Sequence, residues 1–178
     1  MPLSADEEKI KQKAIAFAKE NKKDIGRRFT DKDTFLPEKD PVSVFMAGSP
    51  GAGKTEASKS LIDRLLQGHL KVLRIDPDEL RSEFEDYTGD NSWLFQGAVS
   101  ILVEKIHDLA LKQKQSFLLD GTMSHYDVAE KNVDRSLKKG RLVQILYVYQ
   151  EPCLAWEFVK ARESEEGRRI EPEHFIDQ

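Results

Sequence analysis

The chain lacks the features of a secreted, membrane-spanning or nucleic-acid-binding protein. It is 178 residues long and has one cysteine, Cys153, so no intramolecular disulfide can form, which fits a reducing compartment. No hydrophobic run approaches the ~20 residues of a transmembrane helix, and the polar, acidic start does not resemble a signal peptide. A formal net charge of -4 provides no general attraction to nucleic acid or anionic lipid. We therefore expect a cytoplasmic protein with neither nucleic acid nor a membrane as a partner.

The composition is that of a folded domain. Charged residues make up 34% and hydrophobic residues 39% of the chain, against roughly 25% charged residues in an average soluble protein. A length of this order corresponds to one domain. We expect a single domain over residues 1–178, with a helical lead-in at 1–40 and the core at 41–178.

Hydrophobic periodicity predicts short buried strands that alternate with helices. The strands are expected at 42–47, 71–75, 117–119 and 142–149, and the helices at 54–67, 95–113, 125–139 and 152–162. This alternation predicts an α/β fold, a parallel sheet with helices on both faces. A fifth strand is common in such sheets, which raises the expectation that the core is truncated at its C-terminal end.

An amphipathic helix is expected before the first strand, over residues 4–24. Ser4 and Glu7 have the spacing of a capping box at its start. Further along the chain, the lone Cys153 has no visible base partner and is expected to be a small buried residue.

A phosphate-binding motif lies between the first predicted strand and the helix that follows it. The segment GSPGAGKT matches G-x-x-x-x-G-K-[ST] and predicts a P-loop NTPase fold; its residues are Gly48, Ser49, Pro50, Gly51, Ala52, Gly53, Lys54 and Thr55. Backbone N–H groups and the helix N-terminus would surround the phosphates. Lys54 would contact the β- and γ-phosphates, and Thr55 would supply a hydroxyl to Mg²⁺.

ATP is the expected nucleotide. The letters N-K-x-D of a guanine-reading segment occur at residues 21–24, but before the phosphate loop, whereas a guanine reader follows the later strands.

Carboxylates follow two of the predicted strands, where ligands bind in open α/β sheets. Asp120 stands where an acid commonly orients Mg²⁺, although an aspartate before Gly121 could also cap a turn, and Thr122 in the same turn could touch phosphate or substrate. Asp76 and Asp78 follow the second strand. One of them could accept a proton from an attacking hydroxyl while the other caps a helix. Position alone does not choose between them.

Arginines after the fourth strand are the remaining candidates. Arg162 ends the last predicted helix, and Arg168 and Arg169 lie between Gly167 and Pro172, a segment suited to a lid. Arginines of this kind stabilise charge on a transferring phosphoryl group. The alternative is a solvated charge run.

Together these motifs resemble the zeta-toxin family of bacterial P-loop kinases. The resemblance rests on the phosphate loop with its flanks, I-D-x-D at 75–78, D-G-T at 120–122 and R-x-I-x-P at 168–172, and spans roughly residues 10–176. One departure is that the family's prototype has Glu where this chain has Asp120.

The resemblance implies a kinase that uses ATP and Mg²⁺ and phosphorylates the 3′-hydroxyl of UDP-N-acetylglucosamine or a related nucleotide sugar. In that scheme Asp78 is the general base, Lys54, Arg162 and Arg169 act on the phosphates, and Thr55 and Asp120 serve the metal. Asp76, Arg81 and Thr122 are expected to contact substrate. The family's usual partner is a small helical antitoxin that blocks ATP entry.

Two other functions stay open. One is a P-loop kinase for another small molecule, such as an antibiotic or a nucleotide. The other is a nucleotide-dependent switch without phosphoryl transfer. The lead-in helix has two interpretations as well: it packs as part of the kinase core, or it covers the ATP site as an antitoxin in cis.

Overall fold

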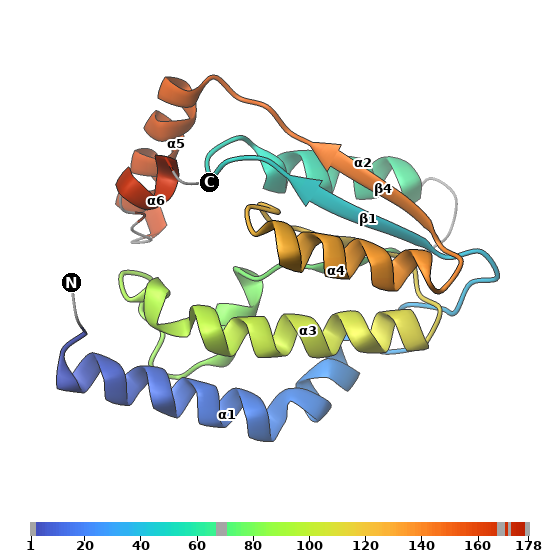
Figure 1. Ribbon diagram of the computed structural model, residues 1–178, viewed down its shortest axis with the longest axis horizontal. Helices are drawn as coiled ribbons and strands as arrows, with labels where there is room; N and C mark the ends of the chain where they lie inside the picture. The colour runs from blue at the N-terminus through green and yellow to red at the C-terminus, as the bar shows by residue number, and fades with distance from the viewer. Residues whose placement is uncertain (1–2, 67–70, 167–169, 171, 177–178) are drawn as a thin grey trace.

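The computed structural model describes residues 3–66, 71–166, 170 and 172–176 (Figure 1). Its helices and strands alternate along most of the chain, in the order α1 (Ala5–Phe29), β1 (Val42–Ala47), α2 (Lys54–Leu66), β2 (Leu73–Ile75), η1 (Glu79–Glu83), η2 (Ser92–Phe95), α3 (Gln96–Lys112), β3 (Phe117–Leu119), α4 (Tyr126–Leu137), β4 (Leu142–Tyr147), α5 (Pro152–Glu166) and α6 (Pro172–Ile176), where η marks a 3₁₀ helix.

In the residues that the structure describes, four strands form one parallel sheet in the order β2-β3-β1-β4. The chain therefore crosses from β1 past β3 to the edge, and returns through β3 to β4 on the other side. Because all strands are parallel, their carboxyl ends meet at one edge of the sheet. That edge carries the phosphate loop after β1 and the acids after β2 and β3.

Alternate side chains of the strands enter two hydrophobic clusters on opposite faces. Phe45 and Phe117 belong to a cluster with α1 and α3, whereas Val44, Met46 and Leu118 face α2. Each large apolar side chain buried in this way contributes roughly 1.5–3 kcal/mol. The expected parallel α/β sheet with helices on both faces is thus confirmed.

The lead-in helix α1 packs against α3 (Figure 1). It begins with the predicted capping box, since Ser4 Oγ accepts from the N–H of Glu7 and the Glu7 carboxylate accepts from the N–H of Ser4. It continues to Phe29, five residues beyond the predicted end, because Ile25 and Gly26 are buried against the core and Thr30 caps the carbonyl of Gly26. These contacts support the interpretation of α1 as part of the core.

Other differences from the predicted elements lie at the ends. Strand β2 is two residues shorter than expected, and α5 is four residues longer. The expected lid segment from Gly167 to Pro172 lies largely outside the described residues, and α6 begins at Pro172. Cys153, expected to be buried, is exposed on α5.

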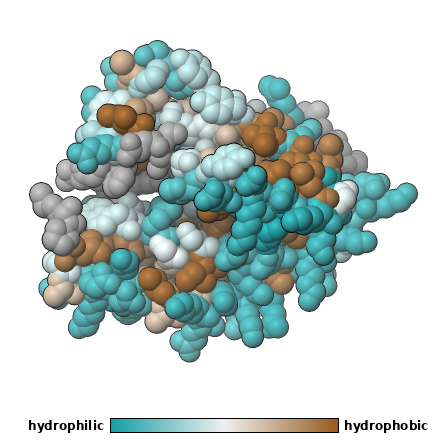
Figure 2. Space-filling view, viewed as in Figure 1, coloured by the Kyte–Doolittle hydropathy of each residue, from teal (hydrophilic) through white to brown (hydrophobic). Residues whose placement is uncertain are grey.

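Strand β4 forms an exposed edge of the sheet. Its sequence reads as a buried strand, yet Leu142, Ile145 and Tyr147 are more than half exposed. Hydrophobic side chains gather on the surface in this region, shown in brown in Figure 2. Within the described ranges, no helix has the length and apolarity needed to cross a membrane.

His107 is buried in the core between α3 and the sheet. Its ring packs edge-to-face on Phe45 and Phe117, with centroid distances of 6.0 and 4.9 Å. Burial, reinforced by the charges of Arg135 and Arg141, lowers the pKa of His107 to about 3. The imidazole is therefore neutral in the folded protein at any pH near neutrality.

This neutral histidine should make the fold sensitive to acid. Below pH 6.5 the unfolded chain takes up a proton at His107 that the folded chain refuses down to about pH 3. The free energy of unfolding should thus decrease as the pH falls from 6.5 to about 3, by up to about 5 kcal/mol in total. His107→Gln should flatten the pH dependence of the free energy of urea unfolding relative to the parent. An equal slope in His107→Gln and the parent would contradict this account.

Candidate active site

The phosphate loop is shaped by two glycines that no other residue could replace. Gly48 and Gly51 have φ angles of +134° and +74°, a region that L side chains rarely adopt. A Cβ on Gly48 would lie 2.3 Å from the carbonyl oxygen of Val148, and one on Gly51 would lie 2.2 Å from that of Ala155. The loop is therefore packed directly against the backbone that leads into α5 and against α5 itself.

Lys54, the first residue of α2, turns back onto the loop. Its Nζ donates hydrogen bonds to the carbonyl oxygens of Gly48 (2.8 Å) and Ser49 (2.7 Å). The ammonium group is thus held over the loop, and Ala52 N–H donates to Ser49 O at 3.2 Å within it. This places the lysine charge at the loop where phosphates would bind.

Asp120 lies behind the first turn of α2. The hydroxyl of Ser58 is 3.0 Å from Asp120 Oδ2 and 2.9 Å from the carbonyl oxygen of Thr55. The Asp120 carboxylate and the start of α2, where Thr55 lies, are therefore linked through one side chain. A carboxylate beside the start of this helix suits Mg²⁺, which takes few protein ligands when phosphates supply others.

Arg74, a residue that the sequence motifs did not single out, joins the acids at the strand ends. Its guanidinium NH2 lies 2.7 Å from Asp76 Oδ2 and 2.5 Å from Asp120 Oδ2, and its NH1 lies 2.5 Å from Glu79 Oε1. Burial opposes the charge of Arg74, but Asp76 and then Asp120 outweigh it, so the pKa of Arg74 is raised. The sequence did contain a sign of this role: an arginine stands in a short strand whose two other residues are buried and hydrophobic.

The two acids after β2 have different surroundings. Asp76 is only 10% exposed and ion-paired with Arg74, and its Oδ1 accepts from the N–H of Asp78 at 2.8 Å. Burial, followed by the neighbouring charge of Asp78, raises the pKa of Asp76. The Asp78 side chain is 41% exposed. Asp76 is therefore the acid that shapes the turn, and Asp78 the one accessible to a ligand.

Arg81 lies behind Asp78. It is buried, donates to Asp78 Oδ1, and donates from NH2 to Gln96 Oε1 at 3.1 Å. The structure thus brings Arg81 to the acid rather than to an open surface. A substrate contact by Arg81 stays a prediction.

The remaining candidates lie around the phosphate loop. The Thr122 carbonyl accepts from the N–H of Gly48 at 3.3 Å, and its hydroxyl is 2.9 Å from that of Ser124. Arg162 on α5 is 36% exposed, and its NH2 lies 3.9 Å from Glu56 Oε1 on α2. Arg168 and Arg169 lie outside the described residues.

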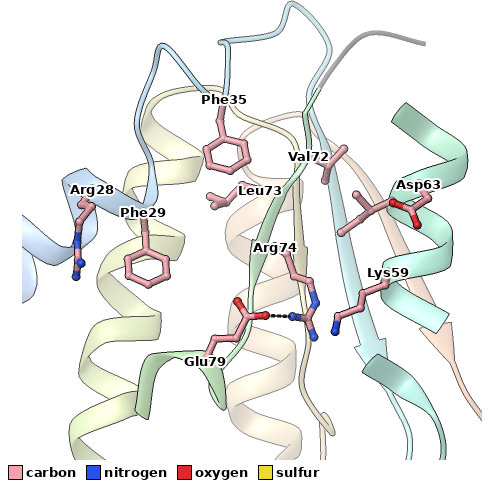
Figure 3. Close-up of a pocket in the computed structure, with 10 residues that line it drawn as sticks. Arg28, Phe29, Phe35, Lys59, Asp63, Val72, Leu73, Arg74 and Glu79 are labelled. Atoms are coloured by element: carbon pink, nitrogen blue, oxygen red, sulfur yellow. Dashed lines mark hydrogen bonds and ion pairs between the residues drawn. The ribbon is translucent and has the colours of Figure 1, made fainter. Parts of the chain in front are cut away.

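A cavity of about 550 Å³ opens beside β2 (Figure 3). Arg74 and Glu79 line it, together with Lys59, Phe29 and Phe35, but no residue of the phosphate loop does. The cavity therefore lies next to the acid cluster and apart from the expected phosphate position.

Comparison with known protein families places most of the chain in one of them. The family model described as Zeta toxin matches residues 26–178. No curated protein sequence matches the chain.

Solved structures share the fold at low sequence identity. A structure from the PezAT chromosomal toxin-antitoxin system of Streptococcus pneumoniae is 22% identical and has a TM-score of 0.67; the match covers 92% of this chain and 65% of that one. The complex of AvrRxo1-ORF1 with AvrRxo1-ORF2, crystallised with sulphate ions, is 14% identical with a TM-score of 0.61, covering 94% and 53%. The chain thus spans about two thirds or less of the length of these two proteins.

Proposed function

This chain belongs to the zeta toxin family, and from that membership we propose that it is an ATP-dependent kinase acting on the 3′-hydroxyl of UDP-N-acetylglucosamine or a related nucleotide sugar. The observation that carries the proposal is the separation of the acids at the strand ends. Asp76 and Asp120 are held by Arg74 and are almost fully buried, whereas Asp78, whose Oδ1 accepts from Arg81, is 41% exposed. A kinase needs one accessible carboxylate of this kind to receive the acceptor's proton.

The proposed reaction is a direct phosphoryl transfer. Asp78 accepts the proton of the sugar hydroxyl while that oxygen attacks the γ-phosphorus, and the bond to the β–γ bridging oxygen breaks, releasing ADP. Lys54 and the loop N–H groups stabilise the charge on the phosphates. Arg162, and Arg169 outside the described residues, are proposed to act on the same group, and Thr122 and Asp76 to line the acceptor side.

Magnesium is proposed as the metal of this site. When bound, it would neutralise charge on the β- and γ-phosphates. Thr55 and Asp120 are the residues that would hold it: Thr55 is the last residue of the phosphate-loop motif, and Asp120 Oδ2 lies 3.0 Å from the hydroxyl of Ser58 on the same helix.

The function is tested by mass spectrometry of acceptors incubated with the protein and Mg·ATP. We expect UDP-N-acetylglucosamine to gain one phosphoryl group on its sugar, and the same reaction with Asp78→Asn to be slower by about 10²–10⁴-fold. A panel of nucleotides and aminoglycosides run in parallel tests the other small-molecule kinases. No product from any acceptor, with slow ATP hydrolysis only, would instead favour a nucleotide-dependent switch.

We propose a small helical antitoxin as the partner. The support is family membership and the toxin-antitoxin system named for the PezAT structure. Such a partner would act by covering the phosphate loop and should weaken binding of ATP.

We also propose a cytoplasmic location, since ATP and nucleotide sugars are found there.

A further inference from the structure

The Arg74 guanidinium lies between the carboxylates of Asp76 and Asp120, a position in which a cation is expected. One nitrogen, NH2, contacts Asp76 Oδ2 at 2.7 Å and Asp120 Oδ2 at 2.5 Å. The other two nitrogens are also used, NH1 by Glu79 and Nε by the Ser58 hydroxyl at 3.1 Å. Figure 3 shows Arg74 meeting Glu79 beside β2.

Two carboxylates this close cannot both stay ionised without a positive charge between them. Asp76 and Asp120 are 10% and 7% exposed, so water screens them little. In the part of the chain that the structure describes, no group of three or more His, Cys, Asp or Glu is arranged to hold a metal ion. The cation that touches both Asp76 and Asp120 is a guanidinium.

The same contacts determine which part of Asp120 remains for a metal. Oδ2 lies within hydrogen-bond distance of both the Arg74 guanidinium and the Ser58 hydroxyl. Because one oxygen of Asp120 is already bonded and its charge is balanced by Arg74, this carboxylate should bind a metal ion only weakly when it is the sole ligand. It becomes useful when phosphate oxygens supply most of the coordination.

We propose that Arg74 is the positioning residue of this carboxylate cluster: it neutralises and orients Asp76 and Asp120, so that Mg²⁺ enters the site only together with ATP. The inference deepens the proposed function and rests on it in one respect, the assignment of Asp120 to the metal.

The first test is metal binding without nucleotide, which needs neither ATP nor an acceptor. Mn²⁺ is titrated into the full chain and free Mn²⁺ is followed by its paramagnetic resonance signal. The parent should bind no Mn²⁺ at micromolar concentrations. Arg74→Gln uncovers two acids and should bind Mn²⁺ at least about tenfold more tightly, since paired carboxylates suit this cation. Arg64→Gln, which removes an exposed arginine from α2, should behave as the parent.

Two outcomes overturn the proposal. One is tight Mn²⁺ binding by the nucleotide-free parent, and the other is Arg74→Gln that is folded by circular dichroism yet binds Mn²⁺ no better than the parent. If Arg74→Gln does not fold, Arg74→Lys decides, because it keeps the charge. It should exclude Mn²⁺ as the parent does, and Mn²⁺ binding by folded Arg74→Lys at micromolar concentrations would count against neutralisation.

The second test separates orientation from charge. A lysine ammonium is a point charge that cannot contact Asp76, Glu79 and Asp120 as the planar guanidinium does. Arg74→Lys should therefore lower kcat about tenfold with the KM for the acceptor unchanged; an unchanged kcat would overturn the orienting role. If the parent phosphorylates no acceptor, the proposed function fails, while the Mn²⁺ titration still decides on Arg74.

Discussion

Replacing Asp78 with asparagine should lower kcat for phosphoryl transfer by about 10²–10⁴-fold, the usual contribution of a general base, and leave ATP binding nearly intact. Asparagine is preferable to alanine because its side-chain oxygen can still accept from the buried Arg81. The change therefore removes the proton acceptor while keeping a partner for the guanidinium. Acceptor turnover and calorimetric ATP binding are measured on the same preparation.

Asp76→Asn is the matched control two residues away. It keeps the acceptor for the N–H of Asp78 but removes a buried charge from Arg74. We expect a loss of stability of about 1–3 kcal/mol, together with a fall in kcat much smaller than that of Asp78→Asn, because the proton acceptor is still present. If Asp78→Asn still turned over normally and Asp76→Asn did not, the roles of the two acids would be reversed.

Replacing Lys54 with methionine should reduce kcat/KM for Mg·ATP by about 10²–10³-fold, the scale for removing one preorganised electrostatic donor. In the structure its ammonium already lies over the loop, bonded to the carbonyls of Gly48 and Ser49. The methionine side chain is of similar length, so α2 should form as before.

Lys59→Met on the same helix is the comparison, since this exposed lysine lies away from the loop. It should leave kcat/KM unchanged. Equal losses in both variants would point to general weakening of α2 rather than to the charge at the phosphates. Thermal unfolding of both variants completes the comparison.

The parts of the fold that depend on local pattern could be predicted. The capping box at Ser4, the phosphate loop between a strand and a helix, and the alternation of strands and helices all follow from residues close together in the sequence. The position of Asp76, Asp78 and Asp120 at one edge follows in turn, because parallel strands place their carboxyl ends together.

What could not be predicted depends on contacts across the sheet. The strand order β2-β3-β1-β4 brings Arg74 of β2 next to Asp120 after β3, a contact that residues close together in the sequence do not indicate. The different surroundings of Asp76 and Asp78 likewise depend on which carboxylate Arg74 binds. The exposure of Ile145 and Tyr147 could not be predicted, because the hydrophobic pattern of a strand does not show whether it lies at the edge or in the centre of a sheet.

The close approach of Gly51 to α5 makes the phosphate loop and the arginine-bearing helix a single mechanical unit. With so little room between the Gly51 backbone and the carbonyl of Ala155, the loop cannot shift toward α5 without pushing the helix. Arg162 stands two turns further along that helix. If a bound nucleotide displaces the phosphate loop toward α5, the helix should move with it, and so should the side chain of Arg162. Nucleotide binding at the loop would then change the position of Arg162 through backbone contact alone.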